Sequence, residues 1–371
     1  MEKRVQAEIL LHHLVQNYRS LQERAGPHPL IAVVKANAYG HDISLVGPEL
    51  RRVGCELFAV TDAWEGATLR ELLGDRERER PAQIFLLSGI VGEEDARLTK
   101  EMRLCPVLSN PGPFEVLERG GFDGPCWLKF DSGMHRLGFY DLPSALAAAQ
   151  ARGLRVEGVL SHFACADEPG HPLNARQVAA FARLMESLGE GFLYSLCNSA
   201  GIENGLDGGL PAYRGPVRAG ISLYGCYNTD QAEAEAAGLR LRPVMRLRAK
   251  VLQRKKLRPG DCVSYGATFV AEREMEVAVV AAGYADGVSR AFSNRGRVWA
   301  GGKECPILGR VCMDLCIVDV SGLKGQVPED VVFWGEGIRA EEAARRAGLI
   351  PYELFTGVGQ RVPRIAVGAG A

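Results

Sequence analysis

The chain lacks the sequence patterns of the common metal and nucleotide sites. Its 10 cysteines include no C-x-x-C pair, and most lie inside apolar segments, so we expect free buried thiols and no metal site. Neither a G-x-x-x-x-G-K-[ST] loop nor a G-x-G-x-x-G turn occurs, because Gly357 and Gly359 are not followed by a third glycine. These absences argue against a zinc module, a P-loop protein and a Rossmann dinucleotide site.

An excess of charge of one sign and long apolar runs are also missing. The 44 basic and 45 acidic residues give a formal net charge of -1, which favours neither nucleic acid nor an anionic membrane as a partner. No apolar stretch approaches the ~18 residues of a spanning helix. The first residues include Glu2 and Glu8, and a signal peptide carries no acids there. We therefore expect a cytoplasmic protein that acts on a small molecule.

Short apolar segments alternate with helical patterns along the first two thirds of the chain. Eight segments are typical of buried strands: 30–35, 57–60, 83–88, 103–108, 127–131, 155–162, 192–197 and 216–222. Between them, residues 142–150 and 174–188 have apolar residues at three- and four-residue spacing, which indicates helices. Eight alternations with right-handed connections predict an α/β fold, a TIM-type (β/α)8 barrel.

The pattern changes after residue 225. Valine-rich runs at 245–252, 276–282, 297–300 and 315–320 are separated by glycine, proline and aspartate turns, which is typical of a mostly β domain. A chain of 371 residues is long enough for two domains. We therefore expect a barrel over residues 1–228 and a C-terminal β domain over residues 229–371.

Polar residues fall at the carboxyl ends of the predicted strands, where barrel enzymes place their active sites. Lys35 ends the first strand, and burial of an amine there would lower its pKa and suit it to Schiff-base chemistry. The other strand ends carry Lys129, Arg136, His162, Asn198, Ser199 and Arg218. Each alone has an ordinary structural explanation, such as a lysine reaching for solvent or a histidine within the core. Together they predict a basic cup on one rim of the barrel.

A phosphate site is expected beside this cup. Gly220 and Ile221 follow the eighth strand, where backbone amides at the start of a short helix can hold a phosphate. Ser199 and Tyr39 can add hydroxyl donors.

The string AVVKANAYGHD, residues 32–42, resembles the signature of alanine racemases. The segments LKFDSGMHRLG, SHFACADE, CNSAG, VRAGISLYG, VSYGATF, GYADG, GRVCMD and RVPR are similar to motifs of that family, in the same order and over nearly the whole chain. The resemblance implies a barrel that binds pyridoxal 5'-phosphate (PLP), a mostly β second domain, and a homodimer whose second domains complete the partner's active sites. It implies interconversion of L-alanine and D-alanine, supplying D-alanine for peptidoglycan.

The resemblance also assigns roles to residues. Lys35 would carry PLP and act as one base, and Tyr265 from the other subunit would be the second base. Two bases on opposite faces of the substrate remove the Cα proton on one side and return it on the other. Arg218 would face the pyridine nitrogen with His162 supporting it, and an arginine there cannot give up its proton to the ring.

The remaining assignments concern the substrate and the surroundings of the site. Arg136 and Met313 of the other subunit would hold the substrate carboxylate. Lys129 matches a lysine that is often carbamylated in the family. Supporting positions are Cys312, Asp314 and Tyr284.

One position departs from the family pattern. Many members have a phosphate-binding tyrosine just before RVPR, where this chain has Gln360. We expect Gln360 to contact the cofactor and to make a more polar entrance, which would admit serine as a second substrate.

Other functions share some of these features. A racemase for serine or for several small amino acids would have the same catalytic core. A barrel PLP decarboxylase shares the lysine and the β domain, but the motifs around Tyr265 and Arg218 disfavour it. A non-catalytic PLP-binding barrel would end near residue 230, and this chain continues well beyond it.

Overall fold

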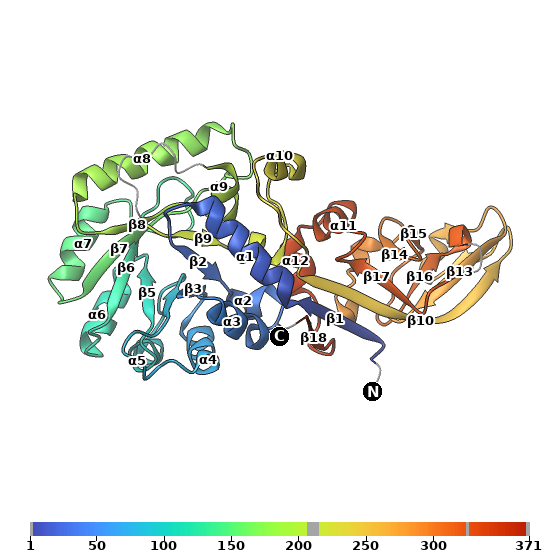
Figure 1. Cartoon of the computed structure of the whole chain (residues 1–371), viewed down its shortest axis with the longest axis horizontal. Helices are drawn as coiled ribbons and strands as arrows, with labels where there is room; N and C mark the ends of the chain where they lie inside the picture. Colours follow the sequence, from blue (N-terminus) through green and yellow to red (C-terminus); the bar gives the residue numbers. More distant parts are fainter. Residues whose placement is uncertain (1–2, 206–214, 324–325, 369–371) are drawn as a thin grey trace.

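The computed structural model describes residues 3–205, 215–323 and 326–368. It has two lobes, a barrel surrounded by helices and a mostly β lobe, with the long strand β10 (Met245–Leu257) running between them (Figure 1). This arrangement confirms the predicted fold class. Within the described ranges, no helix is both long and apolar enough to cross a membrane.

The barrel lobe contains, among the described residues, eight parallel strands that overlap the eight predicted segments. They are β2 (Leu30–Val33), β3 (Leu57–Val60), β4 (Gln83–Leu86), β5 (Cys105–Leu108), β6 (Pro125–Lys129), β7 (Arg155–Leu160), β8 (Leu193–Ser195) and β9 (Val217–Ala219). They pair in the order β8-β7-β6-β5-β4-β3-β2-β9. The two edge strands approach each other where the Arg218 amide donates to the Cys197 carbonyl at 3.0 Å. Most of these strand residues are buried, because helices cover the outside and side chains fill the inside.

Helices follow the strands around the barrel. They are α1 (Leu11–Ala25), α2 (Lys35–Tyr39), α3 (Ile43–Arg52), α4 (Ala63–Leu73), α5 (Glu93–Glu101), α6 (Gly112–Arg119), α7 (Leu142–Gln150), α8 (Pro172–Leu188), α9 (Ser199–Asn204) and α10 (Gln231–Ala236). α7 has the predicted bounds, and α8 begins two residues earlier than predicted, with Pro172 in its first turn. Local sequence sets several ends: the Asp62 carboxylate accepts hydrogen bonds from the first amides of α4, and Gly74 ends that helix with φ 59°.

The second lobe is built around one sheet. Its strands are β1 (Val5–Leu10), β10, β13 (Met275–Val280), β14 (Arg297–Ala300), β15 (Lys303–Leu308), β16 (Cys316–Asp319), β17 (Asp330–Trp334) and β18 (Arg364–Val367), with a separate hairpin of β11 (Cys262–Val263) and β12 (Phe269–Val270). The order is β13-β16-β15-β14-β17-β10-β1-β18, and β10 also pairs with β13. β10 can pair with both β17 and β13 because its first half lies beside β17 and its second half beside β13. Among the described residues, two α-helices complete the lobe: α11 (Ala340–Ala347) and α12 (Pro351–Thr356).

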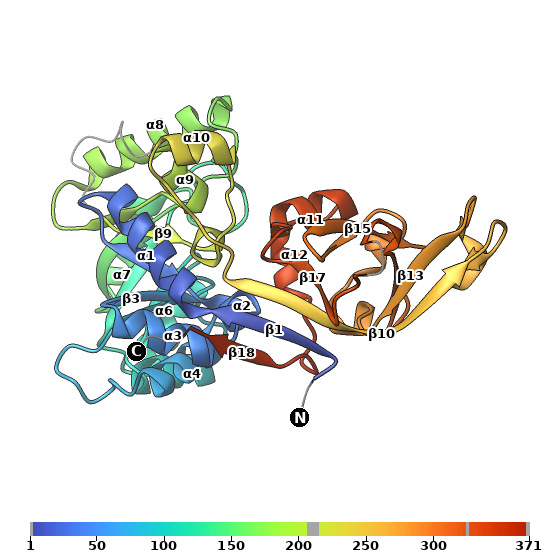
Figure 2. The same ribbon diagram turned by 45° about the vertical axis from the view of Figure 1, so that its right-hand side comes forward.

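β1 was not predicted from the sequence, and it leads into the barrel along the chain. In space it lies in the sheet of the second lobe, antiparallel to β10 and parallel to β18 (Figure 2). Its residues are almost all buried, because this long-range pairing covers them. The pairing ties the start of the chain to its last strand.

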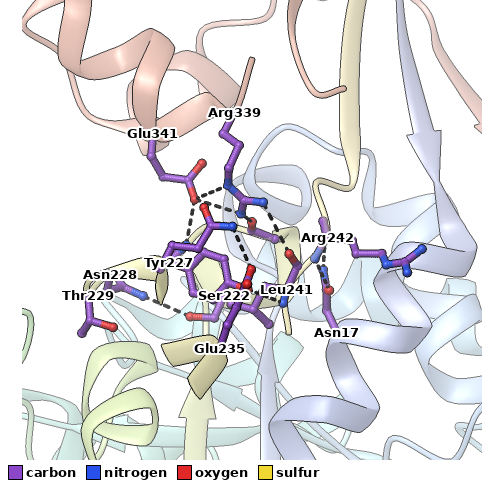
Figure 3. Close-up of polar contacts among 12 residues, drawn as sticks. Asn17, Ser222, Tyr227, Asn228, Thr229, Glu235, Leu241, Arg242, Arg339 and Glu341 are labelled. Carbon is purple, nitrogen blue, oxygen red and sulfur yellow. Dashed lines mark hydrogen bonds and ion pairs between the residues drawn. The ribbon is translucent and has the colours of Figure 1, made fainter. Parts of the chain in front are cut away.

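The connection between the lobes is held by a guanidinium at the start of α11 (Figure 3). Arg339 donates to the carbonyls of Gly225 and Leu241, and its guanidinium carbon lies 4.9 Å from the centre of the Tyr227 ring. Glu341 accepts the Tyr227 amide at 2.9 Å. These contacts fix α11, and α12 after it, against the barrel.

Candidate active site

A cavity of about 530 Å³ lies among the residues that follow the barrel strands. Ten residues predicted for the site line it: Lys35, Tyr39, Lys129, Arg136, His162, Asn198, Ser199, Arg218, Gly220 and Ile221. Among the described lining residues four are cationic and none is acidic. The predicted basic cup is therefore one continuous site, and its charge favours an anionic ligand.

Lys35 is presented by a left-handed turn. Residues 36–39 all have φ between 52° and 54°, a conformation that costs L-residues about 1–2 kcal/mol each. The turn is held from outside, since Glu65 in α4 accepts the Ala36 amide at 2.7 Å. This backbone returns Tyr39 to the cavity that also receives the Lys35 amine.

Burial and neighbouring cations favour the neutral form of both amines in the cavity. Burial lowers the pKa of Lys35, and Arg136 lowers it further. Burial, followed by Arg136 and Arg218, lowers the pKa of Lys129 to about 8. The lowered pKa of Lys35 makes the lone pair that a nucleophile or a base requires more readily available.

Arg218 is held rigidly in β9 and is buried. Its Nη2 donates to the carbonyls of Ser161 at 2.7 Å and Leu196 at 3.0 Å, and its Nη1 donates to the Ser195 hydroxyl. His162 Nδ1 lies 3.1 Å from the same Nη2 and accepts from it, because an arginine has no lone pair to offer. Burial, and then Arg218, lower the pKa of His162 well below its usual value, so this histidine is neutral.

The far end of the cavity forms a phosphate-sized cradle. The Ser199 hydroxyl oxygen accepts the Gly220 amide at 2.8 Å, and Ile221 begins a short 3-10 helix, η1 (Ile221–Tyr224). A Cβ on Gly220 would lie 2.7 Å from the Tyr39 hydroxyl, so only glycine leaves this space open. Hydroxyls and backbone amides at this end, with a free amine at the other, fit the phosphate and the aldehyde of PLP.

Besides Gln360, five predicted site residues lie in the second lobe and do not line this cavity: Tyr265, Tyr284, Cys312, Met313 and Asp314. Hydrogen bonds bring their segments together. The Tyr284 amide donates to the Cys312 carbonyl at 3.0 Å, and the hydroxyl of Ser264, the residue before Tyr265, donates to the Arg310 carbonyl at 2.6 Å. We call these five residues the second-lobe patch.

Three side chains of the patch are open to solvent. Tyr265 is 72% exposed, Met313 53% and Tyr284 45%. A single chain therefore offers these groups on a surface and not to its own Lys35.

The structure does not bring Gln360 into the cavity. It is exposed in the turn after α12, and the aromatic side chain that reaches the cavity is Tyr352, eight residues earlier. Tyr352 lies on α12, and its ring centre is 5.8 Å from that of Tyr39. Burial raises the pKa of Tyr352, so it remains a neutral phenol. The expected polar entrance made by Gln360 is not found in this chain.

Sequence reasoning also missed Leu87, Ser88 and Asn228, which line the cavity. Leu87 and Ser88 directly follow β4, so the rule that strand ends carry the site would have included them. The sequence signal at Tyr352 was only that of a helix start: Pro351 in the first turn and Glu353 accepting the Ile350 amide. The fold and the site define a barrel protein built to hold a phosphorylated aldehyde on a rim lysine.

Comparison with known proteins identifies the family. A model described as the N-terminal domain of alanine racemase matches residues 9–228, and one described as the C-terminal domain of alanine racemase matches residues 244–366. The chain belongs to the alanine racemase family. The biosynthetic alanine racemase of Pseudomonas aeruginosa is 38% identical over 367 residues, which are 96% of this chain and 98% of that protein. The catabolic alanine racemase of Pseudomonas putida is 37% identical over 368 residues, 98% of each.

Solved structures agree over the full length. The crystal structure of the biosynthetic alanine racemase from Pseudomonas aeruginosa matches with a TM-score of 0.88 and 36% identity, covering 99% of this chain and 100% of that one. An alanine racemase from Bartonella henselae, described with covalently bound pyridoxal phosphate, matches with a TM-score of 0.86 and 29% identity over 99% of this chain and 100% of that one.

Proposed function

We propose that this chain is a PLP-dependent alanine racemase that interconverts L-alanine and D-alanine. The observation that carries the proposal is the Lys35 amine, with its lowered pKa, in one basic cavity with the immobilised Arg218 and the Ser199–Gly220 cradle. When bound, PLP withdraws electrons from the substrate Cα and so makes its proton easier to remove. The protein's residues then hold the ligand and move that proton.

Each barrel residue has a proposed task that suits its side chain and its place in the cavity. Lys35 carries the cofactor and serves as the base on one face. Arg218 cannot release a proton, so beside the pyridine nitrogen of bound PLP it would donate a hydrogen bond without protonating the ring, and the neutral His162 keeps the guanidinium oriented. Arg136 pairs with the substrate carboxylate. Lys129, whose pKa of about 8 leaves a larger fraction of free amine near neutral pH than an ordinary lysine has, is the site we propose for carbamylation.

The base on the opposite face is Tyr265 supplied by a second copy of the chain. This is supported by its 72% exposure and by its absence from the cavity of its own subunit. The barrel lobe also exposes large apolar side chains, Trp64 at the start of α4 and Val91 and Tyr140 on loops, which another subunit could cover. We propose a homodimer in which the barrel of one subunit, residues 1–228, together with its own Tyr352, and the second-lobe patch of the other subunit form each site.

The cellular setting is part of the proposal. We infer that the enzyme acts in the cytoplasm, with a small amino acid as its partner and neither nucleic acid nor membrane involved. The relatives named biosynthetic and catabolic are 38% and 37% identical, so sequence identity does not separate these roles. Serine, which differs from alanine by one hydroxyl group, is the second substrate to test.

A chiral assay of the purified protein with PLP and a panel of L-amino acids tests the reaction itself. We expect D-alanine as the main product, and a panel without any D-product would refute the proposal. Tyr265→Phe is expected to abolish racemisation while PLP remains bound through Lys35. Full turnover by that variant would refute the two-base assignment.

Mixing two inactive variants tests whether the sites are shared. In a dimer of one Lys35→Ala subunit and one Tyr265→Phe subunit, one site has lost both bases and the other site is intact. After subunit exchange we therefore expect about a quarter of the wild-type activity. If each site belonged to a single chain, the mixture would stay inactive.

A further inference from the structure

The side chain of Gln177 connects two loops of the active-site rim by hydrogen bonds. It lies in α8 and is fully buried (0% exposed). Its Nε2 donates to the His162 carbonyl at 2.8 Å and to the Ser132 hydroxyl at 3.0 Å, while its Oε1 accepts the Ala164 amide at 3.0 Å. A single amide thus connects the loop after β7, which carries His162, with the loop after β6.

The hydrogen bonds continue from Gln177 in one direction. The Ser132 and Ser161 hydroxyl oxygens are 2.8 Å apart, and Ser161 donates its proton to the Phe130 carbonyl at 2.8 Å. A hydroxyl has one proton to donate, so Ser132 must be the donor to Ser161. The chain of donors therefore runs from Gln177 through Ser132 and Ser161 to Phe130, and we call it the Gln177 relay.

The relay is attached to the groups that surround the substrate. Phe130 follows Lys129, and the Ser161 carbonyl accepts from Arg218 at 2.7 Å. The loop that begins at Ser132 leads to Arg136. It is compact, because the Asp131 carboxylate accepts the amides of residues 133–135 at 2.9 to 3.0 Å. A shift of Ser132 is therefore transmitted to Arg136.

We infer that Gln177 is a positioning residue, which sets the place of Arg136 for the substrate carboxylate through Ser132 and that of His162 through its carbonyl. The inference rests on the proposed function, since it gives Arg136 a carboxylate to hold. Burial makes the effect strong, because an amide that loses its hydrogen-bond partners costs more free energy when buried than when water can replace them. Since Lys35 belongs to another strand, the relay acts on binding of the carboxylate more than on proton transfer by Lys35.

The same helix offers a matched control. Asn174 is also buried (3% exposed), one turn before Gln177, and its Nδ2 donates to the carbonyls of Cys165 and Glu168 at 3.0 and 2.9 Å. Neither acceptor lines the cavity. Asn174→Leu therefore removes a buried amide from α8 without touching the relay.

The test compares Gln177→Met, Ser132→Ala and Asn174→Leu as holoenzymes. Two quantities are measured: KM and kcat for L-alanine, and the dissociation constant of propionate, a carboxylate without the amine, by calorimetry. Loss of one buried hydrogen bond in the relay should raise KM and weaken propionate binding by about tenfold, with kcat of Ser132→Ala nearly unchanged. Ser132→Thr, which keeps the hydroxyl, should restore both values. Asn174→Leu should lower the melting temperature and leave KM and propionate binding as in wild type.

The outcomes separate this inference from the proposed function. If wild type racemises alanine and both relay variants bind propionate as wild type does, the inference is wrong and the function stands. If Asn174→Leu weakens propionate binding as much as they do, the effect is general loosening of α8, and the inference is again wrong. If wild type forms no D-alanine, the proposed function fails, and propionate binding still decides the role of the relay. If Gln177→Met does not fold, Ser132→Ala and Ser132→Thr give the answer.

Discussion

Asp42 holds backbone strain close to the turn that presents Lys35. It has φ 77° and ψ 106°, a combination that glycine adopts easily and other residues adopt at a cost of about 1–3 kcal/mol. The strain is partly offset, because the Asp42 carboxylate caps α3 by accepting the Ser44 amide at 3.0 Å and the Ser44 hydroxyl at 2.7 Å. Position 42 therefore combines a favourable side chain with an unfavourable backbone.

Replacing Asp42 with glycine removes the strain and keeps most of the helix start. We take about 2 kcal/mol for the strain, a few tenths for exchanging an aspartate cap for glycine, and about 0.7 kcal/mol for the greater freedom of glycine in the unfolded chain. The free energy of unfolding should rise by about 1 kcal/mol. Asp42→Ala loses the cap and keeps the strain, so the free energy of unfolding of this variant should fall by about 1 kcal/mol.

Thermal unfolding of the cofactor-free proteins, monitored by fluorescence, checks whether stability rises in the glycine variant and falls in the alanine variant. For a chain of this length 1 kcal/mol corresponds to about 1–2 °C in Tm, so the glycine and alanine variants should differ by about 3 °C. Asp42→Asn keeps an acceptor and tolerates positive φ, so it should melt near wild type and control for the lost charge. The strain argument is refuted if the glycine variant melts at or below the alanine variant.

Two further predictions concern the cavity. The folded-state pKa of Lys129, about 8, is below its ordinary 10.5, so the folded protein takes up this proton less readily than the unfolded chain. The stability of the cofactor-free protein should therefore rise between about pH 8 and 10.5, and Lys129→Met should reduce that rise, leaving the part due to Lys35, in melts performed without carbon dioxide. Tyr352→Ala removes an aromatic wall of the cavity and should speed PLP release by about tenfold, whereas Tyr352→Phe should retain PLP nearly as wild type does. Cofactor fluorescence after dilution measures the rate, and equal release from both variants would contradict a role for the ring.

The barrel was predictable because its signals are local. Each buried strand is a short apolar run, each helix repeats at three or four residues, and the polar residues that end the strands meet on one rim by geometry alone. Ten predicted residues share one cavity for this reason. The second lobe was predicted less completely: β1 carries no local sign that it pairs with β10, more than 230 residues away.

Tyr352 and Gln360 show where sequence reasoning failed. The family resemblance placed the cofactor-contacting residue directly before RVPR, but which side chain reaches the barrel depends on how α12 packs. That packing is set by distant contacts. A Cβ on Gly40 would lie 2.2 Å from the Phe355 carbonyl oxygen, and Arg364 donates to the Gly40 carbonyl at 3.0 Å. Such contacts turn Tyr352 inward and leave Gln360 in solvent.

The sequence by itself determined the order of strands and helices, the lysine at the end of the first barrel strand, and the motifs that identify the alanine racemase family. The tertiary structure decided how these parts act together: the left-handed turn at residues 36–39, the joining of α12 to the cavity, and the exposure of Tyr265. Periodicity and residue type are properties of neighbours along the chain. Strain, burial and cavity shape depend on residues far apart in sequence, and only their packing specifies them.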